Sequence, residues 1–285
     1  MILVTGATGH LGTQVVKHLQ QHLSLAQFAV LARNPSKAQA MIKQSIQVRI
    51  GDFDQSETLI SAFRGIEKLL LISTMEMNRF EQHKRVIDAA KQAGVKHLVY
   101  TSLAIQNIET SAVKDLMMSH FQTEDYLKQS GLTYTILRNT MYAEAIPQII
   151  GEHAASSGIQ LAGGTGKVPY AFRAELGEAT ANVLMQDGHE NKIYHLVGSI
   201  AYSYQDVADA MSQNLDNQVH YTPLSAEHYR DQLASMGLPE FLIYLTAGTV
   251  MDIQNHQYEL DSTDLESLLG RKTERLEHYL SSIYH

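Results

Sequence analysis

The sequence predicts an α/β protein in which a doubly wound parallel sheet is followed by a smaller, mixed α/β lobe. From Met1 to about Arg138, short apolar runs alternate with amphipathic helical segments, which is the pattern of consecutive βα units. The first run leads into a turn with three glycines and then into a helix. After Tyr142 this alternation ends and helical segments dominate. We therefore place the sheet domain at residues 1–142 and the smaller lobe at residues 143–285.

The first twelve residues read Met-Ile-Leu-Val-Thr-Gly-Ala-Thr-Gly-His-Leu-Gly. The run Ile2–Thr5 is β-prone and mainly apolar, as expected of a strand buried on both faces of a parallel sheet. In a dinucleotide-binding turn, Gly6 would allow the sharp bend, Gly9 the approach of a pyrophosphate, and Gly12 close packing of helix and strand. The spacing differs from G-x-G-x-x-G, so this interpretation rests on the strand before the turn and the helix after it. A glycine turn without a ligand is the alternative.

The start of the first helix is the predicted phosphate site. The N–H groups of Gly9, His10 and Leu11 have no partner within a helix that begins there, and the positive end of the helix dipole favours an anion. Together with Gly6 and Thr8, these residues would hold the cofactor's phosphates. The sheet domain is thus predicted to be a Rossmann-type NADP-binding domain, and the lobe to bind the substrate.

The composition is that of an ordinary globular protein and excludes several functions. Of the 285 residues, 44% are hydrophobic and 18% are charged, and the net charge is −8. Because no basic cluster is present, binding to nucleic acid has little electrostatic support. The chain has no cysteine, which excludes disulfides, thiol nucleophiles and cysteine-ligated metals. Its 14 histidines form no H-x-x-x-H pair with a carboxylate in register, so no metal site is predicted.

No secretory or membrane-spanning segment is predicted. No basic region precedes the first apolar run, and the longest apolar candidate, Phe241–Val250, is interrupted by Tyr244, Thr246 and Gly248. We therefore expect a cytoplasmic protein that makes no membrane contact. A homodimer stays open, because no heptad or apolar stripe identifies an interface.

Nine strands are predicted, six in the sheet domain and three in the lobe, the second of which could instead extend the sheet. They are Ile2–Thr5, Phe28–Leu31, Val48–Ile50, Lys68–Ser73, His97–Thr101, Tyr134–Leu137, Ile159–Leu161, Ile193–Leu196 and Val219–Tyr221. Right-handed crossovers place the carboxyl ends of the first six at one edge, where ligands of open α/β sheets bind. Residues directly after these strands are therefore the candidates for a binding site.

Arg33 follows the second strand, at the position where an acidic residue would bind the adenosine ribose of NAD. The local sequence Leu-Ala-Arg-Asn-Pro-Ser-Lys has no acid. Arg33, helped by Lys37 and the Asn34 amide, could neutralise a 2′-phosphate through charge-assisted hydrogen bonds. This favours NADP(H) as the cofactor, with a solvated arginine at the sheet edge as the alternative.

Polar and aromatic residues follow the third and fourth strands. Asp52 could accept a hydrogen bond from the adenine amino group while Phe53 flanks the ring. Alternatively, or in addition, Asp54 or Ser56 caps the next helix. Ser73, with its neighbour Thr74, would line the path of the phosphates and the nicotinamide ribose.

The last two strands of the sheet domain supply the candidates for chemistry. Thr101 and Ser102 end the fifth strand, and the helix Val113–Gln129 follows and carries His120. His120 could bind the ribose hydroxyls or donate a proton, although a lone helical histidine can equally be structural.

Beyond the sixth strand, Asn139 and Tyr142 would reach the cleft. There Tyr142 could stack on a flat substrate or donate a hydrogen bond to it, with packing against the lobe as the alternative.

Several motifs together resemble the NmrA-like atypical short-chain dehydrogenases/reductases, and the likeness runs through nearly the whole chain. These motifs are Val4–Gly12, Ala32–Ala38, Lys68–Ser73, Ala89–Lys96, Tyr100–Leu103, Tyr134–Asn139 and Gly188–Tyr194. Among members, they resemble most the bacterial NADPH:quinone oxidoreductases of type 2, and next the triphenylmethane dye reductases. The resemblance implies a Rossmann fold, NADP(H) and a small quinone or aromatic acceptor.

One departure from the wider superfamily bears on the chemistry. Most short-chain dehydrogenases use a Tyr-x-x-x-Lys pair, and the corresponding positions here are Leu116 and His120. A quinone acceptor needs no such pair, because water can protonate the hydroquinone and placement of the nicotinamide drives hydride transfer. His120 would then hold the ribose, and Asn139 and Tyr142 would position the quinone.

Apolar cover for the acceptor would come from Ala145–Ile150, Tyr170 and Phe172. Two alternatives stay open. One is an NADP-binding redox sensor without significant catalysis, and the other is a reductase of dyes or other conjugated acceptors.

Overall fold

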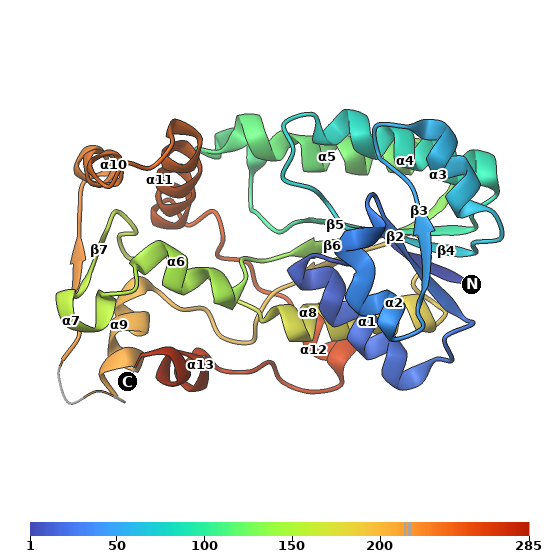
Figure 1. Ribbon diagram of the computed structural model, residues 1–285. Coiled ribbons are helices and arrows are strands. Elements are labelled where there is room, and N and C mark those ends of the chain that lie inside the picture. Colours follow the sequence, from blue (N-terminus) through green and yellow to red (C-terminus); the bar gives the residue numbers. More distant parts are fainter. Residues whose placement is uncertain (214, 216–217, 285) are drawn as a thin grey trace.

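A seven-stranded parallel sheet forms the centre of the protein (Figure 1). The structure is a computed structural model that describes residues 1–213, 215 and 218–284. Residues 214, 216–217 and 285 of the predicted lobe lie outside the described residues. The strand order is β3-β2-β1-β4-β5-β6-β8, which is the Rossmann order with one strand added. The strands are β1 (Ile2–Val4), β2 (Phe28–Ala32), β3 (Gln47–Ile50), β4 (Lys68–Leu71), β5 (His97–Leu103), β6 (Thr133–Asn139) and β8 (Lys192–Leu196).

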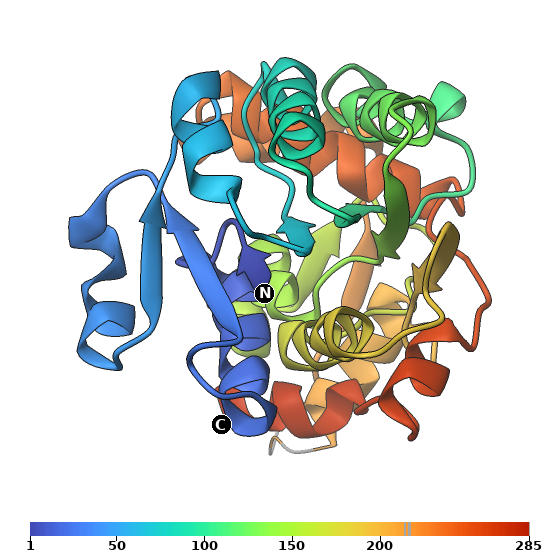
Figure 2. The same cartoon turned by 90° about the vertical axis from the view of Figure 1, so that its right-hand side faces the viewer.

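Helices cover both faces of the sheet (Figures 1 and 2). One layer consists of α1 (His10–His22), α8 (Arg173–Met185) and α12 (Asp264–Leu269). The other consists of α3 (Ser56–Phe63), α4 (Arg79–Ala93) and α5 (Lys114–Gln129). Because both faces are covered, the inner strands β1 and β2 are uniformly apolar and buried, and Leu3 and Val4 have no exposed surface. Short helices lie in the connections between these elements, namely η1 (Pro35–Ala38), α2 (Gln39–Lys43), η2 (Ile108–Thr110) and η3 (Ala143–Ala145).

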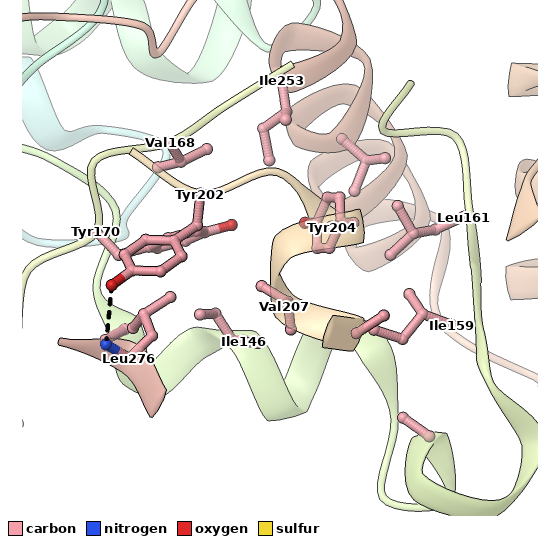
Figure 3. Packing of buried hydrophobic residues seen from close by; sticks show 14 of the residues in the cluster. Ile146, Ile159, Leu161, Val168, Tyr170, Tyr202, Tyr204, Val207, Ile253 and Leu276 are labelled. Carbon is pink, nitrogen blue, oxygen red and sulfur yellow. Dashed lines mark hydrogen bonds between the residues drawn. The ribbon is translucent and has the colours of Figure 1, made fainter. Parts of the chain in front are cut away.

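The remaining elements pack around a second apolar core (Figure 3). They are α6 (Ile146–Ile150), α7 (Ala154–Ser157), β7 (Ile159–Leu161), α9 (Tyr204–Ser212), β9 (Tyr221–Pro223), α10 (Ala226–Ser235), α11 (Glu240–Gln254) and α13 (Leu276–Ile283). The strands β7 and β9 pair in parallel as a small separate sheet. Tyrosines such as Tyr170, Tyr202 and Tyr204 lie among the aliphatic side chains, and the Tyr202 hydroxyl accepts a hydrogen bond from the Leu276 N–H (Figure 3). Among the described residues, no helix is long and apolar enough to cross a membrane.

The predicted doubly wound sheet is confirmed, with differences at particular strands. β4 ends at Leu71, two residues before the predicted end. Ile193–Leu196 lies within β8, which pairs with β6 and therefore extends the main sheet. The strand predicted at Val219–Tyr221 lies two residues further along the chain, because the strand that pairs with β7 is Tyr221–Pro223. The boundary between residues 142 and 143 stays a prediction.

Candidate functional site

A cleft of about 480 Å³ opens at the carboxyl ends of β1, β2, β3 and β4. Ten predicted site residues line it, namely Gly6, Thr8, Gly9, His10, Leu11, Arg33, Asp52, Phe53, Ser73 and Tyr142. The other four, Thr101, Ser102, His120 and Asn139, are buried and are not part of the lining. The cleft thus joins residues from separate βα units, as expected where parallel strands end at one edge.

The glycine turn has the close packing that its sequence predicts. Gly6 has a φ of +60°, which favours glycine, and a Cβ on Gly12 would lie 2.2 Å from the Gly6 carbonyl oxygen. Gly9 precedes the first residue of α1 and has no side chain that could cap the helix. One detail of the prediction is wrong, since the Gly9 N–H donates to the Gly6 carbonyl at 2.9 Å. His10 and Leu11 are left to offer N–H groups to an anion.

Two cations stand free at the β2 end of the cleft. Arg33 and Lys37 both line it and are exposed. Neither side chain forms a hydrogen bond or an ion pair with any residue that the structure describes. The side-chain oxygen of Asn34 is already used within the protein, because Oδ1 accepts the Ser36 N–H at 2.9 Å and caps η1. An anionic group bound here would therefore meet two unpaired positive charges.

Asp52 and Phe53 line the cleft after β3, and Asp52 also forms the turn. Its Oδ1 accepts the Asp54 N–H at 3.0 Å, which leaves Oδ2 for a ligand. The alternative that Asp54 or Ser56 caps the next helix is wrong. Residue Gln55 precedes α3 without a side-chain cap. The carboxylate of Asp54 instead accepts hydrogen bonds from two residues of α4.

The hydroxyls at the end of β5 support the cleft from behind. Thr101 Oγ1 accepts the Ser73 N–H at 2.9 Å and so fixes the residue that follows β4. Ser102 faces away, because its hydroxyl donates to Glu124 Oε1 at 2.7 Å. Arg138 donates to both oxygens of the same buried carboxylate. That Thr101 and Ser102 touch a cofactor stays a prediction.

Tyr142 and Arg173 form the opposite end of the cleft. Arg173 stands at the start of α8, and its Cζ lies 4.4 Å from the centre of the Tyr142 ring. Asn139 lies beside the Tyr142 hydroxyl, and the two atoms of its amide make no regular hydrogen bond within the described chain. Burial raises the pKa of Tyr142, opposed by Asn139 and Arg173, so the phenol stays protonated at neutral pH. Sequence reasoning missed Arg173, because no motif or spacing links the start of α8 to the end of β6.

His120 lies in a buried cluster on the α4 and α5 side of the sheet. Its Nδ1 is 3.0 Å from the Tyr100 hydroxyl. Arg79, which has no exposed surface, donates to the Thr74 carbonyl and to Ser119 Oγ and so ties the lining of the cleft to α5. Burial, with Arg79 and His83 nearby, lowers the pKa of His120 well below 6.5. His120 is thus a neutral imidazole, and its contact with ribose or acceptor stays a prediction.

Because of the same cluster, we expect the free energy of unfolding to be sensitive to mild acid. Burial and Arg79 lower the pKa of His83 from 6.5 to about 3. Between these pH values the unfolded chain binds a proton that the folded chain does not. The free energy of unfolding should therefore fall as the pH drops below 6.5, by up to about 1.4 kcal/mol per pH unit for this histidine. Urea unfolding from pH 7.5 to 5.0 measures this slope, which His83→Gln should reduce.

The exposed His228 on α10 supplies the control for this prediction. His228→Gln should keep the wild-type slope. An unchanged slope in His83→Gln would contradict the assignment of this acid sensitivity to the buried histidine.

The sheet topology and the cleft define a nucleotide-binding α/β protein of the Rossmann class. Residues 1–280 match the NmrA-like family, and the chain belongs to this family. It is 38% identical to quinone oxidoreductase 2 of Escherichia coli K12, over 100% of this chain and 99% of that protein. The structure of the E. coli NADPH-dependent quinone oxidoreductase in complex with NADPH matches with a TM-score of 0.92 over the full length of both chains.

A second solved structure is also similar over the full length. The Citrobacter sp. triphenylmethane reductase complexed with NADP(H) matches with a TM-score of 0.90 and 34% identity, over 100% of this chain and 99% of that one. An NAD(P)H azoreductase of Xenophilus azovorans is 28% identical, over 93% of this chain and 88% of that protein. The relatives are thus reductases of chemically different acceptors.

Proposed function

We propose that this protein is an NADPH-dependent reductase that transfers a hydride to a quinone-type acceptor. The observation that carries the proposal is one continuous cleft, with unpaired cations at one end, a glycine turn in the middle, and Tyr142 and Arg173 at the other. This arrangement offers a charged end to an adenosine 2′-phosphate and an aromatic end to a flat acceptor. The similarity to quinone oxidoreductase 2 over the full length supports the same function.

The residues present fit NADPH. Arg33 and Lys37 would hold the 2′-phosphate, Asp52 Oδ2 would accept from the adenine, and the N–H groups of His10 and Leu11 would bind the pyrophosphate. NADPH supplies the hydride when it is bound. The chain positions both reactants for the transfer.

The acceptor end has no strong acid or base. Leu116 stands where most short-chain dehydrogenases have a tyrosine, and it is buried. The neutral phenol of Tyr142 donates a hydrogen bond to an acceptor oxygen, and the buried amide of Asn139 beside it holds Tyr142 or the acceptor in place. His120 supports the nicotinamide ribose. The final proton comes from water.

A redox sensor that binds NADPH without turnover is the competing function. Similarity to the negative transcriptional regulator NmrA is only 16% in sequence and bears on the fold alone. The deciding experiment follows NADPH oxidation by the purified protein with a panel of small quinones, beside NADH. Quinone-dependent oxidation that prefers NADPH supports the reductase. Tight NADPH binding without oxidation by any acceptor would favour the sensor.

The Tyr142→Phe variant tests the role of the phenol. It should lower kcat/KM for a quinone by about tenfold, since one hydrogen bond to the developing oxyanion is lost. The affinity for NADPH should not change. In Tyr126→Phe, the control, a hydroxyl that donates to Asp88 on the surface is removed, and turnover should be normal.

The His120→Ala variant separates ribose binding from structure. If His120 supports the ribose, the Kd for NADPH should rise even when the protein is folded, as judged by circular dichroism. Full quinone turnover in both His120→Ala and Tyr142→Phe would show that these assignments are wrong. Three further expectations go with the proposal, namely a cytoplasmic location, no nucleic-acid or membrane partner, and a homodimer as an open question.

A further inference from the structure

Arg173 brings a guanidinium to the acceptor end of the cleft, where it lies over Tyr142 and forms a long ion pair with Glu144. Its side chain is only 19% exposed. Nevertheless, none of its five N–H groups donates a hydrogen bond to a residue in the described part of the chain. Partly buried donors are normally paired, so this guanidinium is available to a ligand. Because it lies over one face of the Tyr142 ring and both residues line the cleft, an acceptor oxygen that meets the Tyr142 hydroxyl would also lie close to the guanidinium.

Glu144 is the acidic neighbour, and it offsets this charge only in part. Its Oε2 lies 3.5 Å from Arg173 Nη1, which is longer than the 2.7 to 2.9 Å of a direct charge-assisted hydrogen bond. The shorter contact of the carboxylate is to the backbone N–H of Arg173, at 3.0 Å. Glu144 therefore serves mainly to cap the start of α8. Glu76 also lines the cleft, but it is exposed to water.

Hydride transfer changes charge in opposite ways for two kinds of acceptor. A neutral quinone that accepts a hydride becomes a hydroquinone monoanion, which then takes a proton from water. A triphenylmethane dye is a cation, and the hydride adds to its central carbon to give a neutral product. In both reactions NADPH gives up the hydride and leaves as NADP⁺. A fixed cation stabilises the transition state of the first reaction and repels the substrate of the second.

We propose that Arg173 sets the charge class of the acceptor, favouring neutral or anionic quinones over cationic dyes. This inference rests on the proposed function, because it places the acceptor beside Tyr142. Arg173 is then a catalytic residue, since its guanidinium touches the oxygen on which negative charge develops. Glu144 tunes this effect by reducing the net positive charge at the same point.

The test compares two acceptors in three variants. With saturating NADPH, kcat/KM is measured for 1,4-naphthoquinone and for malachite green in wild type, Arg173→Gln, Arg173→Lys and Glu144→Gln. Arg173→Gln should lower quinone turnover by about 10²-fold and should raise dye turnover. Arg173→Lys should keep most of the quinone preference because it keeps the charge. Glu144→Gln should raise the ratio of kcat/KM for the quinone to kcat/KM for the dye, because it removes the negative charge beside Arg173.

Two controls separate this role from others. Arg230→Gln changes an exposed arginine of α10 and should leave both activities unchanged. The Kd for NADPH, measured by fluorescence titration, should be the same in wild type and Arg173→Gln. If Arg173→Gln instead weakens NADPH binding and lowers both activities equally, the guanidinium serves the cofactor and the inference is wrong. If the wild type reduces no quinone, the proposed function and this inference both fail.

Discussion

Replacement of Arg33 by alanine is expected to abolish the preference for NADPH over NADH. Arg33 and Lys37 are the exposed, unpaired cations at the β2 end of the cleft. A 2′-phosphate bound there would receive charge-assisted hydrogen bonds, each worth about 1.5 to 3 kcal/mol. Loss of the guanidinium should therefore reduce kcat/KM for NADPH by about 10²-fold. NADH, which lacks this phosphate, should be used as before.

The comparison with neighbouring lysines makes this test specific. Lys37→Ala should reduce the preference for NADPH less, because it removes one flexible ammonium group and keeps the planar guanidinium of Arg33. Lys43→Ala, at an exposed position in α2, should leave the ratio unchanged. An equal loss of kcat/KM with NADPH and with NADH in Arg33→Ala would instead mean that Arg33 supports the sheet edge and does not bind the 2′-phosphate.

Residues that follow a strand could be placed from the sequence, because the position of a strand end is a local property. Gly6, Arg33, Asp52 and Ser73 each lie at the end of a predicted strand or within two residues after it, and all four line the cleft. Parallel topology then brings these ends together without any knowledge of side-chain packing. Arg173 follows no strand of the main sheet, so this reasoning could not reach it.

Residues whose neighbours come from another element were harder to place. His120 was expected at the cofactor because of its position on a helix, but its Nδ1 meets Tyr100 of β5 in a buried cluster. Ser102 was expected in the cleft, yet its hydroxyl meets the carboxylate of Glu124. In both cases the partner is distant in the sequence or lies on another element, and side-chain direction decides the contact.

The Gly12→Ala variant is expected to damage the fold and the cofactor site together. A Cβ at residue 12 would lie 2.2 Å from the Gly6 carbonyl oxygen and 2.7 Å from the Ala7 Cα. Both are backbone atoms, so α1 must move away from β1. Overpacking of this kind costs about 1 to 3 kcal/mol or more. We expect a lower midpoint in urea unfolding and no measurable NADPH binding.

Gly9→Ala provides the matched comparison, because its effect should fall on the cofactor alone. The one contact of a Cβ at residue 9 is the Gly6 carbonyl oxygen at 3.3 Å, and Gly9 has an ordinary extended backbone. The stability of Gly9→Ala should therefore stay close to that of wild type. The added methyl group lies where a pyrophosphate must approach the backbone, so the Kd for NADPH should rise by about tenfold or more. Normal NADPH binding in Gly9→Ala would show that the glycine turn does not bind the pyrophosphate, even if Gly12→Ala unfolds as expected.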